Sequence, residues 1–279
     1  TITPSGVIIV NINASQLFTM TPTTGFHVDS LLVDGVNQGQ LTTFTFTNVT
    51  VSHTIRAVFA INQFTITASS GLNGTISPIG AVLVNFGTNQ TFTATPNTGF
   101  HVDSLFVDGV NQGSLTTFTF TNVTIAHTIR AVFVINQFAI TASAGANGVI
   151  TPSGTIGLSF GGNQTFTVTP NTGFHVDSVI VDGVNQGPVT TYTFNNVTVN
   201  HTIRAAFAVN QFTITASAGV NGIITPSGAV VVNFGSNQIF TMVPNIGFHV
   251  DSLLVDGVNQ GSLLTFTFVN TTTNHTIRA

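Results

Sequence analysis

Histidine and aspartate recur at fixed positions in this chain, and they are the side chains best suited to chemistry. His27 and Asp29 are two residues apart, so in a strand both would project from one face. His53 follows on a later segment, and imidazole and carboxylate on neighbouring strands could bind a divalent metal. The same set returns three more times, which favours an exposed polar strand face. We therefore predict no metal, no cofactor and no catalytic residue.

The four arginines are the only basic residues apart from histidine, and they too recur at one position: Arg56, Arg130, Arg204 and Arg278. A guanidinium can bind a carboxylate through paired hydrogen bonds. We expect Arg56 to pair with Asp29 and so to fasten a late strand to the strand that carries His27. The alternative is an arginine that contacts a neighbouring repeat or another chain.

Two short motifs suggest ion binding or modification. The segment from Asp34 to Gly39 faintly resembles a calcium loop, but it lacks the alternating acidic positions and the distal glutamate. Asp-Gly is a hairpin-turn dipeptide, so we predict a plain turn. Asn-X-Thr triplets that fit an N-glycosylation acceptor begin at Asn48, Asn122, Asn196 and Asn270. Such triplets arise often by chance in a chain this rich in threonine and asparagine, so glycosylation stays an open alternative.

The spacing of these residues defines a tandem repeat. The segment 24–39 returns almost unchanged three times, and its Gly25 recurs as Gly99, Gly173 and Gly247, each 74 residues after the one before. Solenoid coils repeat at shorter intervals, so this period is typical of small domains in a row. We predict four units: 1–61, which lacks its first strand; 62–135; 136–209; and 210–279, truncated at its last strand. The chain is then a segment of a longer array, or its terminal unit is completed by another chain.

Composition restricts the partners of the chain. Among 279 residues there are four arginines, eight aspartates, no lysine, no glutamate and no cysteine. The net charge of −4 gives no basic surface for nucleic acid or anionic lipid, and disulfides and thiolate metal sites are impossible. No apolar run approaches the roughly 18 residues of a membrane span. The uncharged polar surface lets copies approach at little electrostatic cost, which favours self-association.

The hydrophobic pattern predicts strands only. Segment 64–68 alternates apolar and polar residues, and so does 90–96, where Pro96 ends the strand because it has no amide to donate. Turns rich in glycine and asparagine separate such segments, and no helical period is present. Roughly seven short strands in each unit predict an all-β fold, an antiparallel immunoglobulin-like sandwich with a period of 74 residues.

The junction between units has its own signature at Asn62-Gln63. Large apolar residues occupy odd positions before this dipeptide and even positions after it. Because a one-residue shift exchanges the two faces of a strand, the dipeptide is a bulge or, more readily, the point where one core ends and the next begins. The same change recurs at Asn136 and Asn210. With no flexible linker between units, we expect a short, stiff connection and a rod.

The order of these segments resembles a known family. Each unit runs through Phe-Gly, a strand ending in Thr-Pro, then Gly-Phe-His-Val-Asp-Ser, Val-Asp-Gly, Phe-Thr-Phe and a closing His-Thr-Ile-Arg-Ala-Val-Phe. The pattern is similar to the divergent internalin-type B-repeat family of tandem bacterial and archaeal surface and secreted proteins. The resemblance implies a cell-surface or extracellular stalk, spacer or adhesive segment with no catalytic residues. It also implies grasp-like units with a short helix as an alternative fold, although this chain has no tryptophan at the aromatic position of the better-known repeats.

These observations lead to a non-catalytic structural protein of the cell surface or an extracellular filament. It would act as a rigid stalk or as a self-assembling fibre subunit whose partners are copies of itself, joined head to tail or by strand donation, or adjoining repeats of a longer chain. The alternative is an adhesin-type module that binds glycans or ice. That module would use threonine rows such as Thr19 with Thr21, Thr45 with Thr47, and Thr93 with Thr95, which could equally be an ordinary solvent face.

Overall fold

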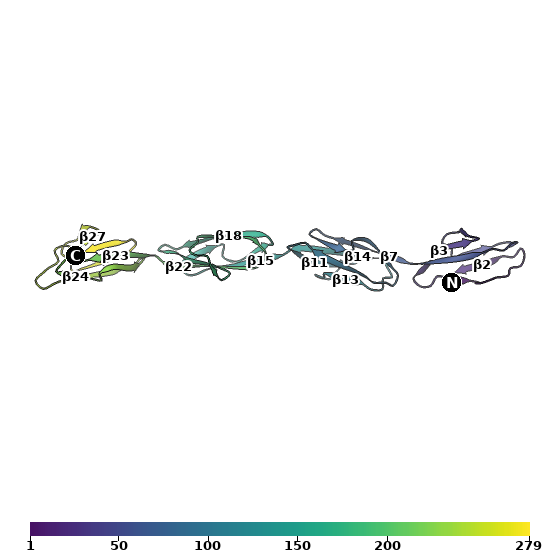
Figure 1. The fold of residues 1–279 in the computed structure, drawn as a ribbon, viewed down its shortest axis with the longest axis horizontal. Coiled ribbons are helices and arrows are strands. Elements are labelled where there is room, and N and C mark those ends of the chain that lie inside the picture. The colour runs from purple at the N-terminus through teal and green to yellow at the C-terminus, as the bar shows by residue number, and fades with distance from the viewer. The chain divides into compact units, whose positions relative to one another are not determined.

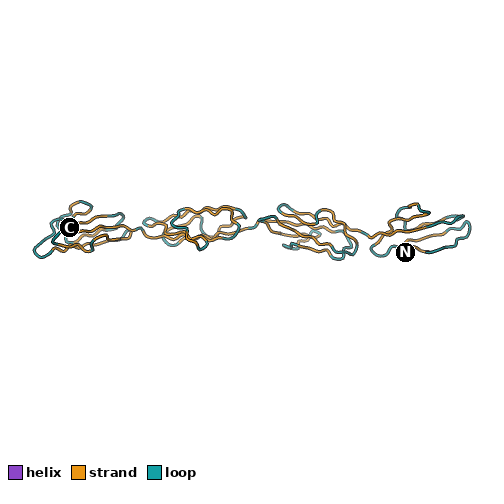
Figure 2. Tube along the Cα trace, viewed as in Figure 1, coloured by secondary structure: helices purple, strands orange, loops and turns teal.

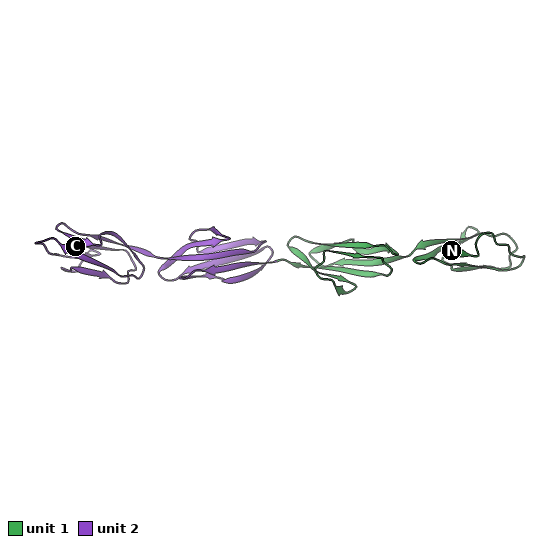
Figure 3. Ribbon diagram, turned by 90° about the horizontal axis from the view of Figure 1, so that it is seen from below, with its two compact units in different colours: residues 1–136 green, residues 137–279 purple.

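The chain is built of strands and loops alone. A computed structural model describes residues 1–279, and Figures 1 and 2 show strands joined by loops, with no helix. The all-β prediction is therefore confirmed. The structure contains no helix long and apolar enough to cross a membrane. The chain divides into two compact units, residues 1–136 and 137–279, which Figure 3 colours separately and which we describe one at a time. We refer to segments 1–61, 62–135, 136–209 and 210–279 as repeats 1 to 4.

The first unit holds repeats 1 and 2. The strands of repeat 1 are β1 (Ile2–Thr3), β2 (Gln16–Met20), β3 (Phe26–Val33), β4 (Val36–Asn37), β5 (Thr43–Phe46) and β6 (Ile55–Ile61). The strands of repeat 2 are β7 (Gln63–Ser70), β8 (Gly74–Ser77), β9 (Gly80–Asn85), β10 (Gln90–Pro96), β11 (Phe100–Val107), β12 (Val110–Asn111), β13 (Thr117–Phe120) and β14 (His127–Ile135).

The second unit holds repeats 3 and 4. The strands of repeat 3 are β15 (Gln137–Ala144), β16 (Gly148–Thr151), β17 (Gly154–Ser159), β18 (Gly162–Pro170), β19 (Phe174–Val181), β20 (Val184–Asn185), β21 (Thr191–Val197) and β22 (His201–Val209). The strands of repeat 4 are β23 (Gln211–Ser217), β24 (Gly222–Thr225), β25 (Gly228–Asn233), β26 (Gln238–Pro244), β27 (Leu254–Val255), β28 (Val258–Asn259), β29 (Thr265–Phe268) and β30 (His275–Arg278).

Repeat 2 shows the complete sheet topology. Its larger sheet has the order β12-β11-β14-β7-β9 and its smaller sheet the order β13-β10-β8. Every neighbouring pair is antiparallel, as predicted, except β14 with β7, which run parallel. A parallel pair needs a long crossover connection, and here almost the whole repeat lies between the two strands. Repeats 2, 3 and 4 thus open and close with strands that lie side by side.

The other repeats follow this plan, with one difference in repeat 1. Repeats 3 and 4 have the five-stranded orders β17-β15-β22-β19-β20 and β25-β23-β30-β27-β28 and the three-stranded orders β16-β18-β21 and β24-β26-β29. Repeat 1 has β1-β2-β5 and only β4-β3-β6, so it contains no counterparts of β7 and β9.

Each repeat encloses its own core between its two sheets. In repeat 2, Phe92 and Ala94 of β10 point inward. Thr91, Thr93 and Thr95, which alternate with them, face solvent, as the sequence predicts. The Phe92 ring meets Phe120 edge to face, with ring centroids 6.0 Å apart. Phe166 and Phe240 are fully buried at the equivalent positions of repeats 3 and 4. The cores are separate hydrophobic clusters that follow one another along the chain.

A β-bulge interrupts the strand that carries the His-Val-Asp motif. In β11 the pairing with β14 shifts between Val102 and Ser104, which makes Asp103 the extra residue. The bulge changes which positions face the core, so that Val102, Ser104 and Leu105 are all buried. The Ser104 hydroxyl donates a hydrogen bond of 3.1 Å to the Asp103 carboxylate, which satisfies the buried serine. The same shift occurs in β3 and β19.

Candidate functional site

The Asp-Gly dipeptide forms a two-residue hairpin loop between β3 and β4. Asp34 has φ 51° and Gly35 has φ 79°, and Val33 pairs with Val36 across the turn. Positive φ at both central residues defines a type I′ turn, whose twist matches that of the flanking strands. The predicted turn is confirmed, and it recurs in all four repeats.

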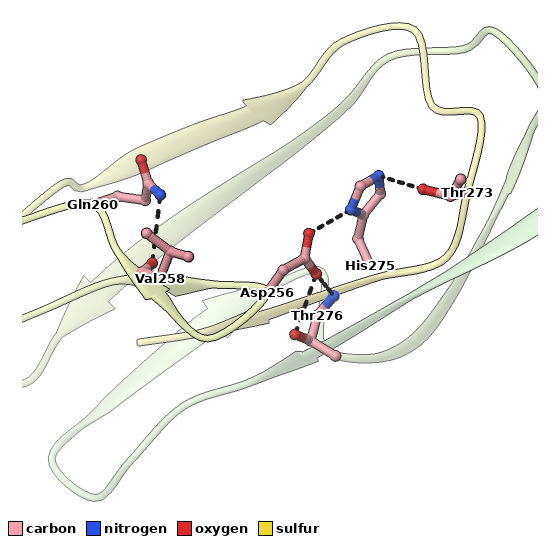
Figure 4. A network of polar contacts seen from close by, with 6 residues as sticks. All are labelled: Asp256, Val258, Gln260, Thr273, His275 and Thr276. Carbon is pink, nitrogen blue, oxygen red and sulfur yellow. Dashed lines mark hydrogen bonds and ion pairs between the residues drawn. The ribbon is translucent and has the colours of Figure 1, made fainter.

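The aspartate of this turn also binds the last strand of the repeat. Its Oδ1 accepts a 2.7 Å hydrogen bond from the backbone amide of Thr54, and its Oδ2 lies 2.6 Å from Nδ1 of His53. The equivalent pairs, at 2.6 to 2.7 Å, are His127 with Asp108, His201 with Asp182, and His275 with Asp256. Figure 4 shows the pair in repeat 4, where Asp256 also contacts the hydroxyl and amide of Thr276. We call this arrangement the Asp–His clasp.

The clasp keeps the aspartate ionised. The hydrogen bond from His53 and then the amide of Thr54 lower the pKa of Asp34 below its usual value of 3.8. In Asp108, partial burial acts to raise the pKa, but the Thr128 amide and the His127 hydrogen bond outweigh it, so its pKa is also lowered. The pKa values of Asp182 and Asp256 are lowered by the same balance of burial against hydrogen bonds. The histidine is fixed on its other side by Phe46, whose ring stacks on His53 at 4.7 Å.

The structure separates the residues that sequence reasoning grouped as possible metal ligands. Nδ1 of His27 lies 2.8 Å from Oδ1 of Asn62, whereas His53 is held by Asp34. His27, Asp29 and His53 are therefore not gathered, and the structure contains no cluster of three histidines or carboxylates that could hold a metal ion. The tight contacts of the two histidines are with partners that the sequence analysis did not assign to them.

The prediction that Arg56 pairs with Asp29 is wrong. Arg56 lies opposite Leu32 on β3, and the only ion pairs are those of the Asp–His clasps. The bulge at Asp29 displaces this carboxylate from the register that simple alternation predicts. In repeat 2, the Arg130 guanidinium instead lies over the Phe106 ring, 5.1 Å from its centroid.

A single residue joins consecutive repeats within each unit. Strand β6 ends at Ile61 and β7 begins at Gln63, so only Asn62 lies between the two sheets. Its amide donates to the carbonyl of Gly25 at 2.7 Å, and its carbonyl accepts from the amide of Phe86 at 2.8 Å. Asn62 therefore binds one residue from the repeat before it and one from the repeat after it. Asn210 makes the same two bonds, to Gly173 and Phe234.

The ring of Phe86 packs directly against Gly25 at this joint. Gly25 has φ 85°, and a Cβ atom placed on it would lie 2.3 Å from Cδ1 of Phe86. Gly173 with Phe234 repeats the arrangement, with a corresponding distance of 2.2 Å. Glycine is needed at both positions, because the backbone is left-handed there and the phenylalanine ring fills the space of a side chain. We call the asparagine, glycine and phenylalanine together the joint triad.

The asparagines of the Asn-X-Thr triplets and the threonines of β10 are exposed. Asn48, Asn122, Asn196 and Asn270 are exposed and have left-handed φ values of 50° to 53°, so each Asn-X-Thr triplet starts at the surface. On the smaller sheet of repeat 2, Thr91 pairs with Thr119 across β10 and β13, and Thr93 pairs with Thr117. The Thr91 and Thr119 hydroxyls hydrogen-bond each other at 2.8 Å. Whether the asparagines are glycosylated, or the threonines bind a ligand, stays a prediction.

Fold and sequence together place the chain among tandem all-β repeat proteins. The family model described as the divergent InlB B-repeat domain matches residues 64–137 and 138–211, which together make up more than half of the chain. The chain therefore belongs to the divergent InlB B-repeat family, as the sequence motifs predict. No curated protein sequence matches it.

Solved structures offer only weak likenesses. The Bacillus anthracis TIE protein matches with 9% identity and a TM-score of 0.31, over 95% of this chain and 67% of that one. The I9–I11 tandem of titin matches with 8% identity and a TM-score of 0.14, over 78% and 97%. The pilus adhesin SpaC from Lactobacillus rhamnosus GG matches with 8% identity and a TM-score of 0.20, over 87% and 46%. At such scores none of these likenesses supports an inference about this chain.

Proposed function

We propose that this chain is a non-catalytic structural array that works as a stiff extracellular stalk or as the building block of a surface fibre. Membership of the divergent InlB B-repeat family supports this assignment, because B-repeat domains are typically found on cell surfaces or outside cells. In the fibre form, the partner molecules carry the same repeat. The near absence of charge supports close packing of such molecules, since their surfaces repel each other weakly.

The joint triad is the observation that carries this proposal. A flexible spacer would need a linker of several glycine or serine residues, whereas one residue connects β6 to β7. That residue is fixed by backbone hydrogen bonds on both sides, and the Phe86 ring packs where Gly25 leaves room. His27 adds a side-chain bond to Asn62. These contacts oppose bending at the joint.

Pulsed electron spin resonance tests the stiffness directly. The chain has no cysteine, so Thr45→Cys in repeat 1 and Thr119→Cys in repeat 2 place two spin labels on opposite sides of the first joint. We expect a narrow distance distribution that Phe86→Ala broadens. Leu83→Ala, which removes an exposed side chain from the neighbouring strand β9, is the matched control and should leave the width unchanged. A broad distribution in the unsubstituted joint would contradict the stalk proposal.

A second candidate function uses the threonine face of the smaller sheet. The register of β8, β10 and β13 brings Thr75, Thr93 and Thr117, with their neighbours, to one exposed surface. Such a row of hydroxyls offers hydrogen bonds to a glycan or to ice. Glycan-array binding or thermal hysteresis that Thr93→Val lowers would favour this function. The absence of both activities leaves the face as an ordinary solvated sheet surface.

A further inference from the structure

The larger sheet of repeat 2 ends in a strand whose outer edge has no neighbouring strand. Strand β9 closes the order β12-β11-β14-β7-β9 and pairs on one side only, with β7. It has six residues, whereas the other edge strands of this repeat, β8, β12 and β13, have two to four. The outer edge of β9 is therefore the longest unpaired strand edge in repeat 2.

The pairing with β7 shows which backbone groups of β9 face outward. The Phe86 amide donates to the Asn62 carbonyl at 2.8 Å, which continues the β7–β9 register and fixes its phase. Hydrogen-bonded and non-hydrogen-bonded pairs alternate along an antiparallel ladder, so the residues at even positions of β9 bond to β7. The amides and carbonyls of Ala81 and Leu83 therefore point away from β7, where no strand receives them.

The side chains along this edge are apolar and uncharged. Ala81 and Leu83 are exposed, Leu83 to 63%, and Val82 between them is half-buried. Natural edge strands are commonly protected from pairing by lysine, proline, a bulge or short length. Segment 80–85, Gly-Ala-Val-Leu-Val-Asn, has no charge and no proline, and its pairing with β7 has no bulge. Nothing in this edge opposes the approach of another strand.

Repeat 4 presents the same edge, and repeat 3 presents a weaker one. Strand β25 ends its sheet with the sequence Gly-Ala-Val-Val-Val-Asn, and its Val231 is 58% exposed at the position of Leu83. The Phe234 amide bonds to Asn210, so Val231 also directs its backbone outward. In β17 the equivalent residue is Gly157, and glycine inside a strand weakens it.

We propose that the outer edge of β9 pairs antiparallel with the same edge of a second copy of this chain, and that β25 forms a second edge of this kind. In β9, Val82 lies opposite its own copy on a two-fold axis, and Ala81 lies opposite Leu83. The two outward amides of each molecule then donate to the two outward carbonyls of the other. A two-fold contact uses one surface on both molecules, so an uncharged edge of this kind is its own complement. This inference rests on the fibre form of the proposed function, for which it names the contact between copies.

Sedimentation velocity of the full chain over a range of concentrations tests the self-association. We expect reversible growth from monomer to dimer and larger species, since each chain carries two such edges. Leu83→Pro combined with Val231→Pro removes the outward amides but leaves the bonds of the neighbouring residues to β7 and β23. This double variant should weaken association at least about tenfold, because each interface loses two backbone hydrogen bonds. A chain that stays monomeric at every concentration, or a double variant that associates normally, would overturn the proposal.

Charge variants separate the edge from surface hydrophobicity in general. Leu83→Lys combined with Val231→Lys places charge on both edges, so association should be lost while the circular dichroism spectrum stays unchanged. Val110→Lys combined with Val258→Lys is the matched control, because it adds the same charges to exposed valines at the opposite ends of the same two sheets. The control should associate normally. Equal loss in both double variants would refute the assigned edge.

The register has a test of its own, because the chain contains no cysteine. Ala81→Cys and Leu83→Cys are made in separate chains and mixed with oxidised glutathione. Opposed residues of a hydrogen-bonded pair have Cα atoms about 5.5 Å apart, which is within the range of a disulfide. The mixture should therefore form a cross-linked dimer, and each variant alone should form little. Equal cross-linking in the mixture and in the separate variants would contradict the register centred on Val82.

The test of this edge and the test of the stalk can fail separately. The distance measurement across Asn62 reports on a single molecule and does not depend on the edge of β9. A stiff joint in a chain that stays monomeric therefore counts against edge pairing only. Self-association through β9 with a broad distance distribution counts against the stalk only.

Discussion

At the residue scale, the polar contacts of the Asp–His clasp join two distant segments of each repeat. The aspartate of each Asp–His clasp sits in a left-handed turn conformation and binds an amide, a hydroxyl and an imidazole from a strand 19 or 20 residues later. These bonds tie the hairpin of β3 and β4 to the start of β6. Every bonding atom of the carboxylate is engaged within the protein. This accounts for the recurrence of one aspartate and one histidine in each repeat.

The first prediction concerns the clasp of repeat 2. Asp108→Asn keeps a side chain that tolerates positive φ but removes the charge that binds Thr128 and His127, so it should destabilise this repeat by about 1 kcal/mol. Hydrogen exchange of the β14 amides in the full chain should accelerate accordingly. Asp103→Asn removes the same charge from the bulge of β11 and keeps an oxygen to accept from Ser104, so it serves as the control. Equal acceleration in both variants would show that the clasp contributes nothing specific.

Sequence alone identified the right residue types here but not their partners. It assigned His53 to a strand near Asp29 and assigned Asp34 to a turn only. The pairing depends on how two distant segments meet in the sheet, and alternation along one strand says nothing about that distance. The bulge at Asp29 then shifts the register on which the arginine prediction relied.

At the element scale, the strands of one repeat are predictable and their order in the sheet is less so. The alternation of apolar and polar residues correctly predicted the inward face of β10. The dipeptide Asp-Gly correctly predicted the hairpin between β11 and β12. The parallel pairing of β14 with β7 was not foreseen, because local patterns carry no information about partners that are far apart in sequence. The change of face at Asn62 did mark the residue at which β6 gives way to β7. Three hydrogen bonds hold Asn62 in place, so the connection between β6 and β7 is ordered.

The second prediction tests the glycine of the joint triad in the second unit. In Gly173→Ala the new methyl group meets the Phe234 ring, so we expect a loss of about 1–3 kcal/mol from overpacking, added to the cost of positive φ. Gly187→Ala is the matched control, because Gly187 has φ 79° and no atom within 4 Å of the added Cβ. Hydrogen exchange at Asn210 and Phe234 should rise strongly in the first variant only. Similar changes in both would mean that backbone strain, and not the ring contact, sets the requirement for glycine.

At the scale of the whole molecule, the few charged residues lie at sites that recur in every repeat. The chain has eight aspartates, and four of them belong to Asp–His clasps. No lysine, glutamate or cysteine adds a competing response to pH or to redox conditions. A change of solution conditions that acts on one clasp therefore acts on every repeat at once. The stability of the array should follow the titration of these carboxylates.

The third prediction is a loss of stability in acid that is shared by all four repeats. The pKa of each clasp aspartate is lower in the folded chain than its usual 3.8, so the folded state binds fewer protons than the unfolded state as the pH falls. The stabilisation is then fully present above about pH 4 to 5 and declines as the pH falls through the lowered values. Urea unfolding followed by circular dichroism between pH 6 and pH 2.5 should show this decline. A variant with asparagine in place of Asp34, Asp108, Asp182 and Asp256 should be less stable at pH 6 and should lose less on acidification. If its urea midpoint falls as steeply as that of the unsubstituted chain, the acid response has another origin, and the four aspartates outside the clasps become the groups to test.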